Sequence, residues 1–153
     1  ELVAKVLIDK NSPFLKSIIV NKGSKDNVKL GMAVLDETYL VGKIVEVNYS
    51  TSRVLLVSDL NSKIPVGIEP GNIQSILSGT GRISGKIEYL ETDILIQDKS
   101  IVYTSGSGGL FKPGIPIGTY HKETEENYEI VNFFSKLSQL TFVKLVSFEE
   151  GSN

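Results

Sequence analysis

Short stretches in which apolar and polar residues alternate recur along the whole chain, and this repetition constrains the fold more than any other feature. Near the start, Leu2, Ala4 and Val6 are apolar, with Lys5 between them. A period of two is typical of a half-buried β-strand, and no stretch sustains the spacing of an amphipathic helix. Gly, Asn, Asp, Ser and Pro separate the stretches. We therefore expect about a dozen short strands in an all-β barrel or sandwich.

The predicted strands leave little room for helix. Two short connectors have helical character, Asn132–Gln139 and Ser12–Leu15, the second with serine as N-cap and proline at the first helical position. A boundary between two small units is expected near Asn61–Lys63. Besides stretches within 2–8, 41–47 and 140–147, the predicted strands are Ser17–Val20, Met32–Leu35, Arg53–Ser58, Lys63–Ile68, Lys86–Leu90, Asp93–Gln97, Ile101–Thr104, Ile115–Tyr120 and Tyr128–Val131.

The composition narrows the classes of partner. Hydrophobic residues make up 41% of the 153 residues and charged residues 22%, which is ordinary for a globular protein. A net charge of −2 with only two arginines gives no basic stripe for phosphates, which argues against nucleic acid as a partner. The apolar runs are far shorter than the roughly 20 residues of a membrane-spanning helix. Because the chain begins with Glu1 rather than Met, we treat it as an excised fragment whose missing N-terminus carries any anchor or export signal.

Metal and cofactor chemistry finds no support in the residue pattern. The chain has no cysteine, which excludes disulfides and thiolate sites, and its single histidine has no partner at metal-ligand spacing. The segment Gly79–Gly85 is glycine-rich like a phosphate-binding loop, but the pattern of a strand rather than a helix follows it. We expect no metal and no cofactor, and a glycine-rich bend at this position.

The glycine-rich stretch Thr104–Gly118 raises the question whether Ser107 is a nucleophile. Gly106–Gly109 is similar to the Gly-Asp-Ser-Gly-Gly motif of trypsin-like proteases, but the aspartate before the serine is missing. The only histidine, His121, follows the serine, and a serine without a general base does not attack at neutral pH. We therefore expect no catalytic residue. A trypsin-like serine hydrolase with an eroded motif remains the enzymatic alternative.

The same stretch has the residue types of a tight turn. Glycine adopts positive φ at no steric cost, and proline fixes φ for the entry to the next strand. We expect Phe111 to fill a core. The predicted structural turn residues are Gly106, Gly108, Gly109, Pro113 and Gly114.

Two tyrosines flank a polar segment in the second half of the chain. Tyr120 precedes and Tyr128 follows residues 122–127, which read as a solvated hairpin tip. A tyrosine at such a place presents an apolar ring and a polar hydroxyl to a partner. Tyr120 and Tyr128 are therefore the predicted partner-binding residues.

Several stretches carry a resemblance to a known family. Thr104–Gly118 is similar to the pattern Thr-Ser-Gly-x-Gly-Gly-x-Phe-Pro-x-Gly-Ile-Pro-Ile-Gly, and Asn21–Val34 to Lys-Gly-x-x-x-Gly-Val-x-x-Gly-Met-x-Val. Together with the shorter matches, they resemble the extracytoplasmic region of the bacterial rod shape-determining MreC family. Departures concern local turns, as at Asn27 in place of Gly, where asparagine also tolerates a left-handed conformation. The shorter matches are Leu40–Ile44, Ser52–Asp59, Ile64–Val66 and 142–146, and the other departures are Gln97 and the order Lys112-Pro113.

The resemblance implies a particular all-β fold. It consists of two small β-barrels with a chymotrypsin-like topology and very little helix. Residues 1–62 would form the first barrel, completed by a returning strand within residues 137–150. Residues 63–136 would form the second, glycine-rich barrel.

The resemblance also implies a non-enzymatic function in cell shape maintenance. Family members act as scaffolds of the cell-wall elongation complex, on the periplasmic face of the inner membrane, anchored by an N-terminal helix and self-associating through a coiled coil. The implied partners are the elongation-specific penicillin-binding transpeptidase, whose active state the contact favours, MreD and, through the membrane-proximal part, MreB. We expect contact through an apolar barrel face or cleft, or through an unpaired edge strand. A β-barrel module of an efflux or secretion adaptor is the second alternative.

Overall fold

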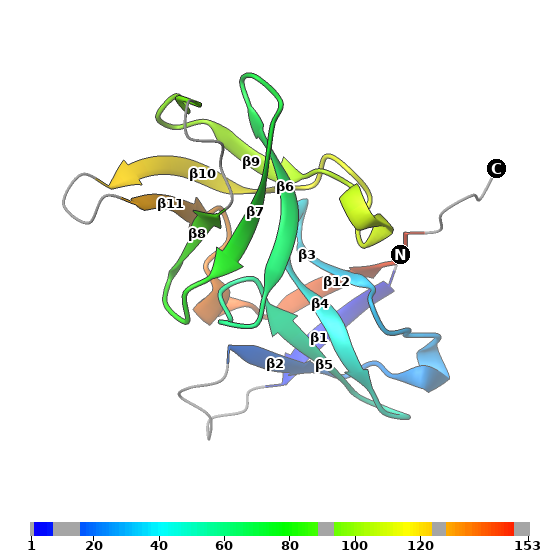
Figure 1. Cartoon of the computed structure of the whole chain (residues 1–153). Coiled ribbons are helices and arrows are strands. Elements are labelled where there is room, and N and C mark those ends of the chain that lie inside the picture. The colour runs from blue at the N-terminus through cyan, green and yellow to red at the C-terminus, as the bar shows by residue number, and fades with distance from the viewer. Residues whose placement is uncertain (1, 8–15, 89–93, 124–127, 149–153) are drawn as a thin grey trace.

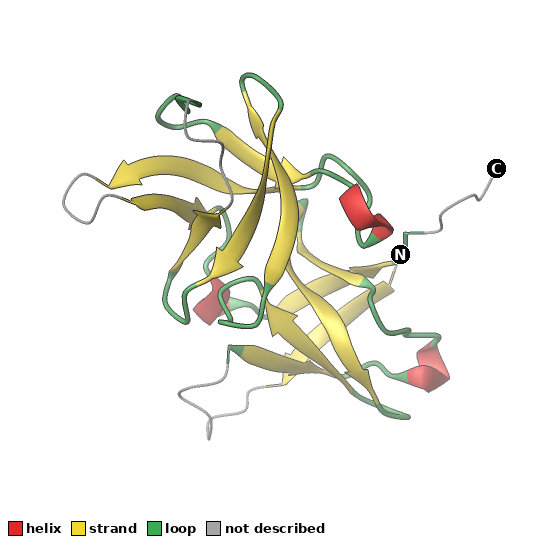
Figure 2. Ribbon diagram, viewed as in Figure 1, coloured by secondary structure: helices red, strands yellow, loops and turns green. Residues whose placement is uncertain are grey.

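The computed structural model describes residues 2–7, 16–88, 94–123 and 128–148. In these residues the chain forms two closed β-barrels of six strands each, packed against one another (Figure 1). Figure 2 shows that strands and loops make up nearly all of the described chain. The described helices are single 3-10 turns: η1 (Ser24–Asp26), η2 (Ser107–Gly109) and η3 (Leu137–Gln139). The predicted all-β, two-barrel fold class is confirmed.

The first barrel joins the start of the described chain to its end. Its strands are β1 (Leu2–Leu7), β2 (Ser17–Val20), β3 (Ala33–Asp36), β4 (Tyr39–Val47), β5 (Ser52–Leu56) and β12 (Phe142–Val146). They close in the order β1-β12-β3-β4-β5-β2, and the pairs are antiparallel. β12 returns to lie between β1 and β3, so residues more than a hundred positions apart share one sheet.

The second barrel is formed by the strands in between. They are β6 (Lys63–Glu69), β7 (Ile73–Gly79), β8 (Ser84–Glu88), β9 (Ile101–Thr104), β10 (Pro116–Glu123) and β11 (Tyr128–Phe133). Their order is β10-β11-β8-β7-β6-β9, again antiparallel and closed. Closure pairs each described strand on both sides, which removes the exposed edges of an open sheet.

Each barrel encloses an aliphatic core, as the alternating sequence requires. Side chains of successive strand residues point to opposite faces, so every second residue enters the barrel. The buried residues of the first core are Ala4, Val20, Val28, Val34, Val41, Ile44, Val54, Leu56, Val143 and Leu145. The second core includes Ile64, Val66, Ile68, Leu77, Ile87, Val102, Phe111, Ile117, Tyr120 and Val131.

The two barrels share a packed seam. Three buried side chains from the first barrel pack in the core of the second. They are Ala33 of β3, Leu40 of β4 and Val57, which directly follows β5. Leu137 packs against both cores. Because interiors are packed as densely as organic crystals, such a shared core resists relative movement of its two sides.

The structure differs from the sequence prediction in three segments. The strand β7 is missing from the prediction because buried serines at 75 and 78 interrupt its apolar alternation. The strand predicted over Asp93–Gln97 is wrong for residues 94–97, which have no regular structure, and Asp93 lies outside the described residues. The helix predicted over Asn132–Gln139 is also wrong. Its first two residues extend β11 by pairing Asn132 with Ser84 and Phe133 with Gly118, which leaves only the turn η3.

Two further expectations concern helices. The connector predicted over Ser12–Leu15 lies outside the described residues. Within the described ranges, we find no helix that has both the length and the apolar character needed to span a membrane.

Candidate partner-binding groove

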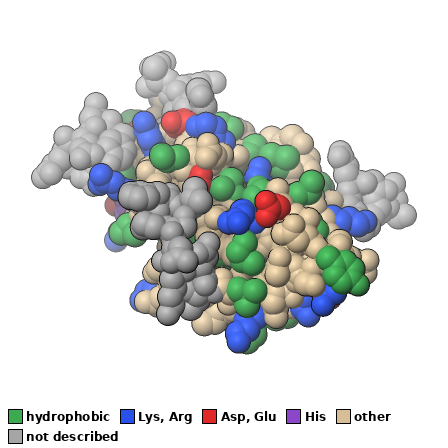
Figure 3. Space-filling view, turned by 90° about the horizontal axis from the view of Figure 1, so that it is seen from below, with side chains coloured by type: hydrophobic (Ala, Val, Ile, Leu, Met, Phe, Trp, Pro, Cys, Tyr) green, Lys and Arg blue, Asp and Glu red, His purple; other side chains and the backbone are tan. Residues whose placement is uncertain are grey.

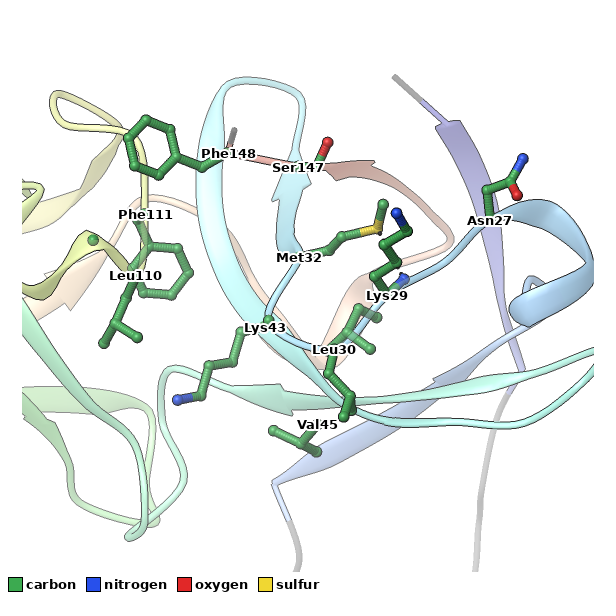
Figure 4. Close-up of a pocket in the computed structure, with 13 residues that line it drawn as sticks. Asn27, Lys29, Leu30, Met32, Lys43, Val45, Leu110, Phe111, Ser147 and Phe148 are labelled. Atoms are coloured by element: carbon green, nitrogen blue, oxygen red, sulfur yellow. Dashed lines mark hydrogen bonds between the residues drawn. The ribbon is translucent and has the colours of Figure 1, made fainter. Parts of the chain in front are cut away.

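An open groove lies where the two barrels meet, on the side of η2 (Figure 4). It has a volume of about 740 Å³. Three parts of the first barrel and one loop of the second contribute to it, so neither barrel forms it alone. Its lining residues are Asn27, Lys29, Leu30, Gly31 and Met32 before β3, Lys43, Ile44 and Val45 of β4, Gly109, Leu110 and Phe111 after η2, and Ser147 and Phe148 after β12.

Large apolar side chains are exposed along this groove. Leu30 is 68% exposed and Leu110 47%, and Val45 and Phe148 also reach the solvent. Two lysines, Lys29 and Lys43, line the groove, and no carboxylate does. Exposed apolar side chains that gather in a concavity with a polar margin are typical of protein-binding sites.

The loop before β3 is held against β4 by backbone geometry. Asn27 has φ 67° and Gly31 has φ 88°, so the chain turns twice through the left-handed region. The Gly31 N–H donates to the Ile44 carbonyl at 2.8 Å, and the Ile44 N–H donates to the Met32 carbonyl at 2.9 Å. Leu30 sits at the tip of this turn and is therefore left in solvent. Asparagine at position 27 does adopt the left-handed conformation that the family pattern assigns to glycine.

The loop that carries Leu110 is closed at its base by Thr104. The Thr104 hydroxyl donates to the Lys112 carbonyl at 2.7 Å and accepts from the Ile115 N–H at 2.9 Å. The Thr104 carbonyl accepts from the Gly114 N–H at 2.8 Å. Phe111 is buried in the second core while Leu110, its neighbour, faces the groove. One buried threonine thus fixes which of two adjacent apolar residues stays exposed.

The predicted turn glycines have left-handed backbones. The φ angles are 81° at Gly106, 76° at Gly108, 69° at Gly109 and 88° at Gly114. A Cβ atom at Gly106 would lie 3.0 Å from the Cβ of Pro113, whereas one at Gly108 would meet nothing within 4 Å. Gly106 therefore meets both a conformational and a steric demand.

Ser107 and His121 do not form a catalytic pair. Ser107 lies exposed in η2, where its N–H donates to the Ser105 hydroxyl at 3.2 Å. His121 lies on β10, with Nε2 at 3.0 Å from the Thr119 hydroxyl and Nδ1 at 3.6 Å from an Asp98 carboxylate oxygen. Nucleophilic catalysis needs a base within hydrogen-bond reach of the serine. The geometry gives the hydrolase alternative no support.

The predicted exposure of Tyr120 is wrong. Its side chain is 2% exposed and packs in the second core. Burial raises the pKa of its phenol to about 12, and the carboxylates of Glu129 and Asp98 add to the effect. The reason is strand parity, because Tyr120 lies on the inward face of β10 rather than at its end. The buried ring offers a partner almost no exposed surface for a direct contact.

Tyr128 is described only in its backbone. It begins β11, where it pairs with Glu123 of β10. Its side chain and residues 124–127 lie outside the described part of the molecule. Its proposed contact with a partner stays a prediction.

Sequence reasoning missed the groove residues for identifiable reasons. Leu30 and Leu110 are apolar residues next to turn glycines, and that combination is the available signal, because a turn gives an apolar side chain no core to enter. Regular alternation over residues 41–47 would place Val45 on the same face as Val41, but the register of β4 against β5 shifts between Ile44 and Glu46. The bulge leaves Ile44 buried and Val45 exposed.

Closed barrels also decide how a partner can bind. Among the described strands, each has a hydrogen-bonded neighbour on both sides, so the expected unpaired edge strand is wrong for this part of the molecule.

A second groove of about 340 Å³ adjoins the first, sharing Ser147 and Phe148 and extending to Lys112–Pro116. Within the described ranges, no three His, Asp or Glu side chains gather as a metal site would require. The arrangement is suited to protein contact through side chains.

Comparison with known proteins gives the family. Residues 6–147 match the model of rod shape-determining protein MreC, barrel core. The chain belongs to the MreC family. It is 35% identical over 147 residues to the cell shape-determining protein MreC of Caulobacter vibrioides, an alignment that covers 96% of this chain and 42% of that protein. The Escherichia coli protein of the same name is 29% identical over 135 residues, covering 86% of this chain and 37% of that protein. The chain thus spans about two fifths of the length of these relatives.

Solved structures of the family share the fold. MreC from Pseudomonas aeruginosa superposes with a TM-score of 0.84 at 31% identity, covering 95% of this chain and 98% of that one. A complex between penicillin-binding protein PBP2 and MreC from Helicobacter pylori has a chain that superposes with a TM-score of 0.68 at 14% identity, covering 93% of this chain and 96% of that one. The first likeness supports the family, and the second shows the fold. The adaptor alternative receives no support from either.

Proposed function

We propose that this MreC-family chain is a non-enzymatic scaffold of the bacterial cell-wall elongation complex. It binds the elongation-specific penicillin-binding transpeptidase on the extracytoplasmic side of the inner membrane and favours its active state. The single observation that carries the proposal is the exposed apolar groove at the barrel junction, in a chain whose family determines cell shape. The Helicobacter pylori complex supports the choice of partner, because there MreC and PBP2 are bound to one another.

The groove is suited to holding an apolar segment of the partner. Leu30 and Leu110 approach from opposite barrels, and Phe148 adds an aromatic surface between them and the second groove. Burying such side chains is favourable by about 25 cal/mol per Å² of apolar surface. Ile44 and Thr104 each accept and donate hydrogen bonds that hold the supporting backbone, so little ordering entropy is lost on binding. Lys29 and Lys43 would steer an acidic margin of the partner.

Binding measurements with groove variants test the proposal. Leu30→Ser combined with Leu110→Ser should weaken binding of the transpeptidase ectodomain at least about tenfold, because both apolar anchors are lost. Leu95→Ser is the matched control, since Leu95 is 89% exposed and lies outside the groove. Calorimetry or surface plasmon resonance gives the affinities, and circular dichroism checks folding. Equal affinity of the double variant and the control would contradict this site.

The remaining contacts belong to the same proposal. The full-length protein, held at the membrane by its anchor, would also contact MreD, MreB and a second copy of itself. Activation is tested separately, by measuring transpeptidase turnover with the 153-residue chain and with the double variant. If the chain binds without changing turnover, the scaffold function stands and the activating function fails.

A further inference from the structure

A second recess lies on the other side of the barrel junction, beside η3, and the groove described above does not include it. Residues of η3 and of the turn between β7 and β8 line it, and in Figure 1 these two segments lie on the side of the molecule opposite η2. Its volume is about 450 Å³. Its lining residues are Lys16, Leu56 and Ser58 around β2 and β5, Arg82 and Ile83 before β8, and Asn132, Phe133, Ser135, Lys136, Leu137 and Ser138 from β11 to η3.

Three positively charged side chains line this recess. Lys16, Arg82 and Lys136 come from three separate elements, and no carboxylate lines the recess. Among the described residues, Arg53 pairs with Glu46 and Lys63 with Glu88, and Lys16, Arg82 and Lys136 take part in neither ion pair. On the face seen from below, Lys and Arg groups are scattered among hydrophobic ones, with few acidic groups between them (Figure 3).

The carboxylate adjacent in sequence to Ser58 is bound by backbone N–H groups and not by the three cationic side chains. Asp59 is buried, and its two oxygens accept hydrogen bonds from backbone N–H groups. Lys16 N–H donates to one at 3.3 Å and Asn61 N–H to the other at 2.8 Å. Asp59 therefore holds the chain around the recess, and none of the three cationic side chains forms an ion pair with it.

A buried hydroxyl in the lining is unpartnered. Ser135 is 8% exposed, and its Oγ is the only buried side-chain oxygen or nitrogen of the described residues without a hydrogen-bond partner. By contrast, the hydroxyl of the buried Ser52 donates to the Lys22 carbonyl, and that of the buried Ser78 donates to the Glu88 carboxylate. A buried polar group without a partner is costly, so its presence in the wall of a cationic recess indicates a ligand that would satisfy it.

The rest of the lining is apolar. Ile83 is 92% exposed at the mouth, and Phe133 and Leu137 lie half-buried deeper in. The recess is much larger than a single inorganic anion needs, and it falls in the size range of pockets that hold a ligand with an apolar body. Because it is concave and lies between two barrels, a flat bilayer surface does not reach into it.

We propose that this recess binds an acidic, partly apolar segment of a partner polypeptide. Two or more carboxylates of the segment pair with Lys16, Arg82 and Lys136. An apolar side chain of the segment packs on Ile83 and Leu137, and the Ser135 hydroxyl donates to a carboxylate or carbonyl oxygen. The site is independent of the apolar groove, because the two share no lining residue.

A peptide titration of the full 153-residue chain tests the proposal. The probe is the capped peptide Asp-Leu-Glu-Leu-Asp, and its Asn-Leu-Gln-Leu-Asn counterpart is the neutral control. In amide NMR spectra we expect saturable shifts at residues 16, 82 and 132–138, weakened by added salt. Replacing Lys16, Arg82 and Lys136 by Gln should weaken binding on the order of tenfold. The matched variant replaces Lys5, Lys99 and Lys122 by Gln, three exposed lysines that line neither groove nor the recess, and should bind as the parent does.

Ser135→Ala separates a ligand role from a structural one. Removing an unpartnered hydroxyl should leave the unfolding free energy equal or higher, while peptide affinity falls severalfold. Equal affinity of the acidic and neutral peptides, or of the two triple-Gln variants, would overturn the proposal. So would the same shifts with inorganic phosphate at similar concentrations, or binding to phosphatidylglycerol vesicles without binding to the peptide.

Discussion

At the scale of single residues, backbone conformation decides what the glycine-rich turn can tolerate. Gly106 and Gly108 both have φ near 80°, but only Gly106 is also crowded, by Pro113. Ser107 between them is exposed and uses only its N–H in the turn. Three neighbouring positions therefore place different demands on a side chain.

Alanine substitutions should rank these positions. Gly108→Ala should lower the unfolding free energy by about 1 kcal/mol, the usual cost of an L-residue in the left-handed region, and Gly106→Ala by more. Ser107→Ala should change it by less than about 0.5 kcal/mol. Urea denaturation measures all three. A Ser107→Ala effect as large as that of Gly108→Ala would contradict a purely conformational turn.

Glu88 is a residue whose charge stabilises the fold. Its carboxylate accepts from the Ser78 hydroxyl at 2.7 Å and lies 3.3 Å from the Lys63 ammonium. The hydrogen bond from Ser78 and the charge of Lys63 hold the pKa of Glu88 below its usual value. A carboxyl whose pKa is lower in the folded state stabilises the protein above its unfolded pKa, and that stabilisation is lost as pH falls through the folded pKa.

Glu88→Gln should therefore flatten the acid limb of the stability curve. At neutral pH the variant should be less stable by about 1 kcal/mol, because a charged acceptor at a partly exposed site is replaced by a neutral one. As pH falls through the lowered pKa of the folded state the difference should shrink, because the wild-type carboxyl then becomes protonated. Urea unfolding across this pH range is the measurement, and a constant difference would refute the charge as its cause.

At the scale of elements, strand parity determines which side chains a partner can meet. β10 alternates along its length, and its partner strand β11 pairs Val131 with Tyr120. Both side chains are buried, so the ring is part of the barrel interior. What distinguishes Tyr120 from an exposed tyrosine near a loop is that its side chain lies on the face of β10 that points into the closed barrel.

Two substitutions at Tyr120 test its place in the core. Tyr120→Ala should destabilise the chain by about 3–5 kcal/mol, as truncation of a buried aromatic does, while Tyr120→Phe should cost under about 1.5 kcal/mol. Tyr120→Phe should keep full affinity for the transpeptidase. Thermal unfolding and the binding assay read out the two effects. If the Phe variant lost binding while its melting temperature stayed unchanged, the result would show that Tyr120 contacts the transpeptidase after all.

At the scale of the whole molecule, the seam makes two barrels one folding unit. The backbone of Leu40 belongs to β4 of the first barrel, and its side chain is buried in the core of the second. Tyr39 and Phe134 stack across the same region, with ring centroids 4.9 Å apart. The apolar groove and the cationic recess both lie at this junction, so the rigidity of the junction sets the geometry of each binding surface.

Leu40→Ala tests this coupling. It should lower the unfolding free energy by about 2–5 kcal/mol, and native-state hydrogen exchange should speed up in the slowest amides of both barrels together. Leu95→Ala, at an exposed position, should leave both unchanged. Faster exchange confined to one barrel would show that the barrels unfold independently.

Sequence reasoning reached the fold class because strand formation is local. Alternation marked the segment 101–104 with the bounds that the structure has, and turn chemistry marked Asn27 and the glycines of Thr104–Gly118. It failed where a tertiary contact overrides a local pattern. Phe133 joins β11 because Gly118 offers it a pairing partner, and β7 holds serines that find partners in β8, as Ser78 does in Glu88.

The sequence by itself determined the all-β class and the family resemblance, because period-two alternation and glycine turn motifs are properties of neighbouring residues. Only the tertiary structure decided the binding surfaces. Leu30 meets Leu110, and Lys16 meets Arg82 and Lys136, only after two closed barrels pack at one seam. Such meetings depend on barrel closure and bulge position, which bring together residues separated by more than fifty positions and leave no trace in the local pattern.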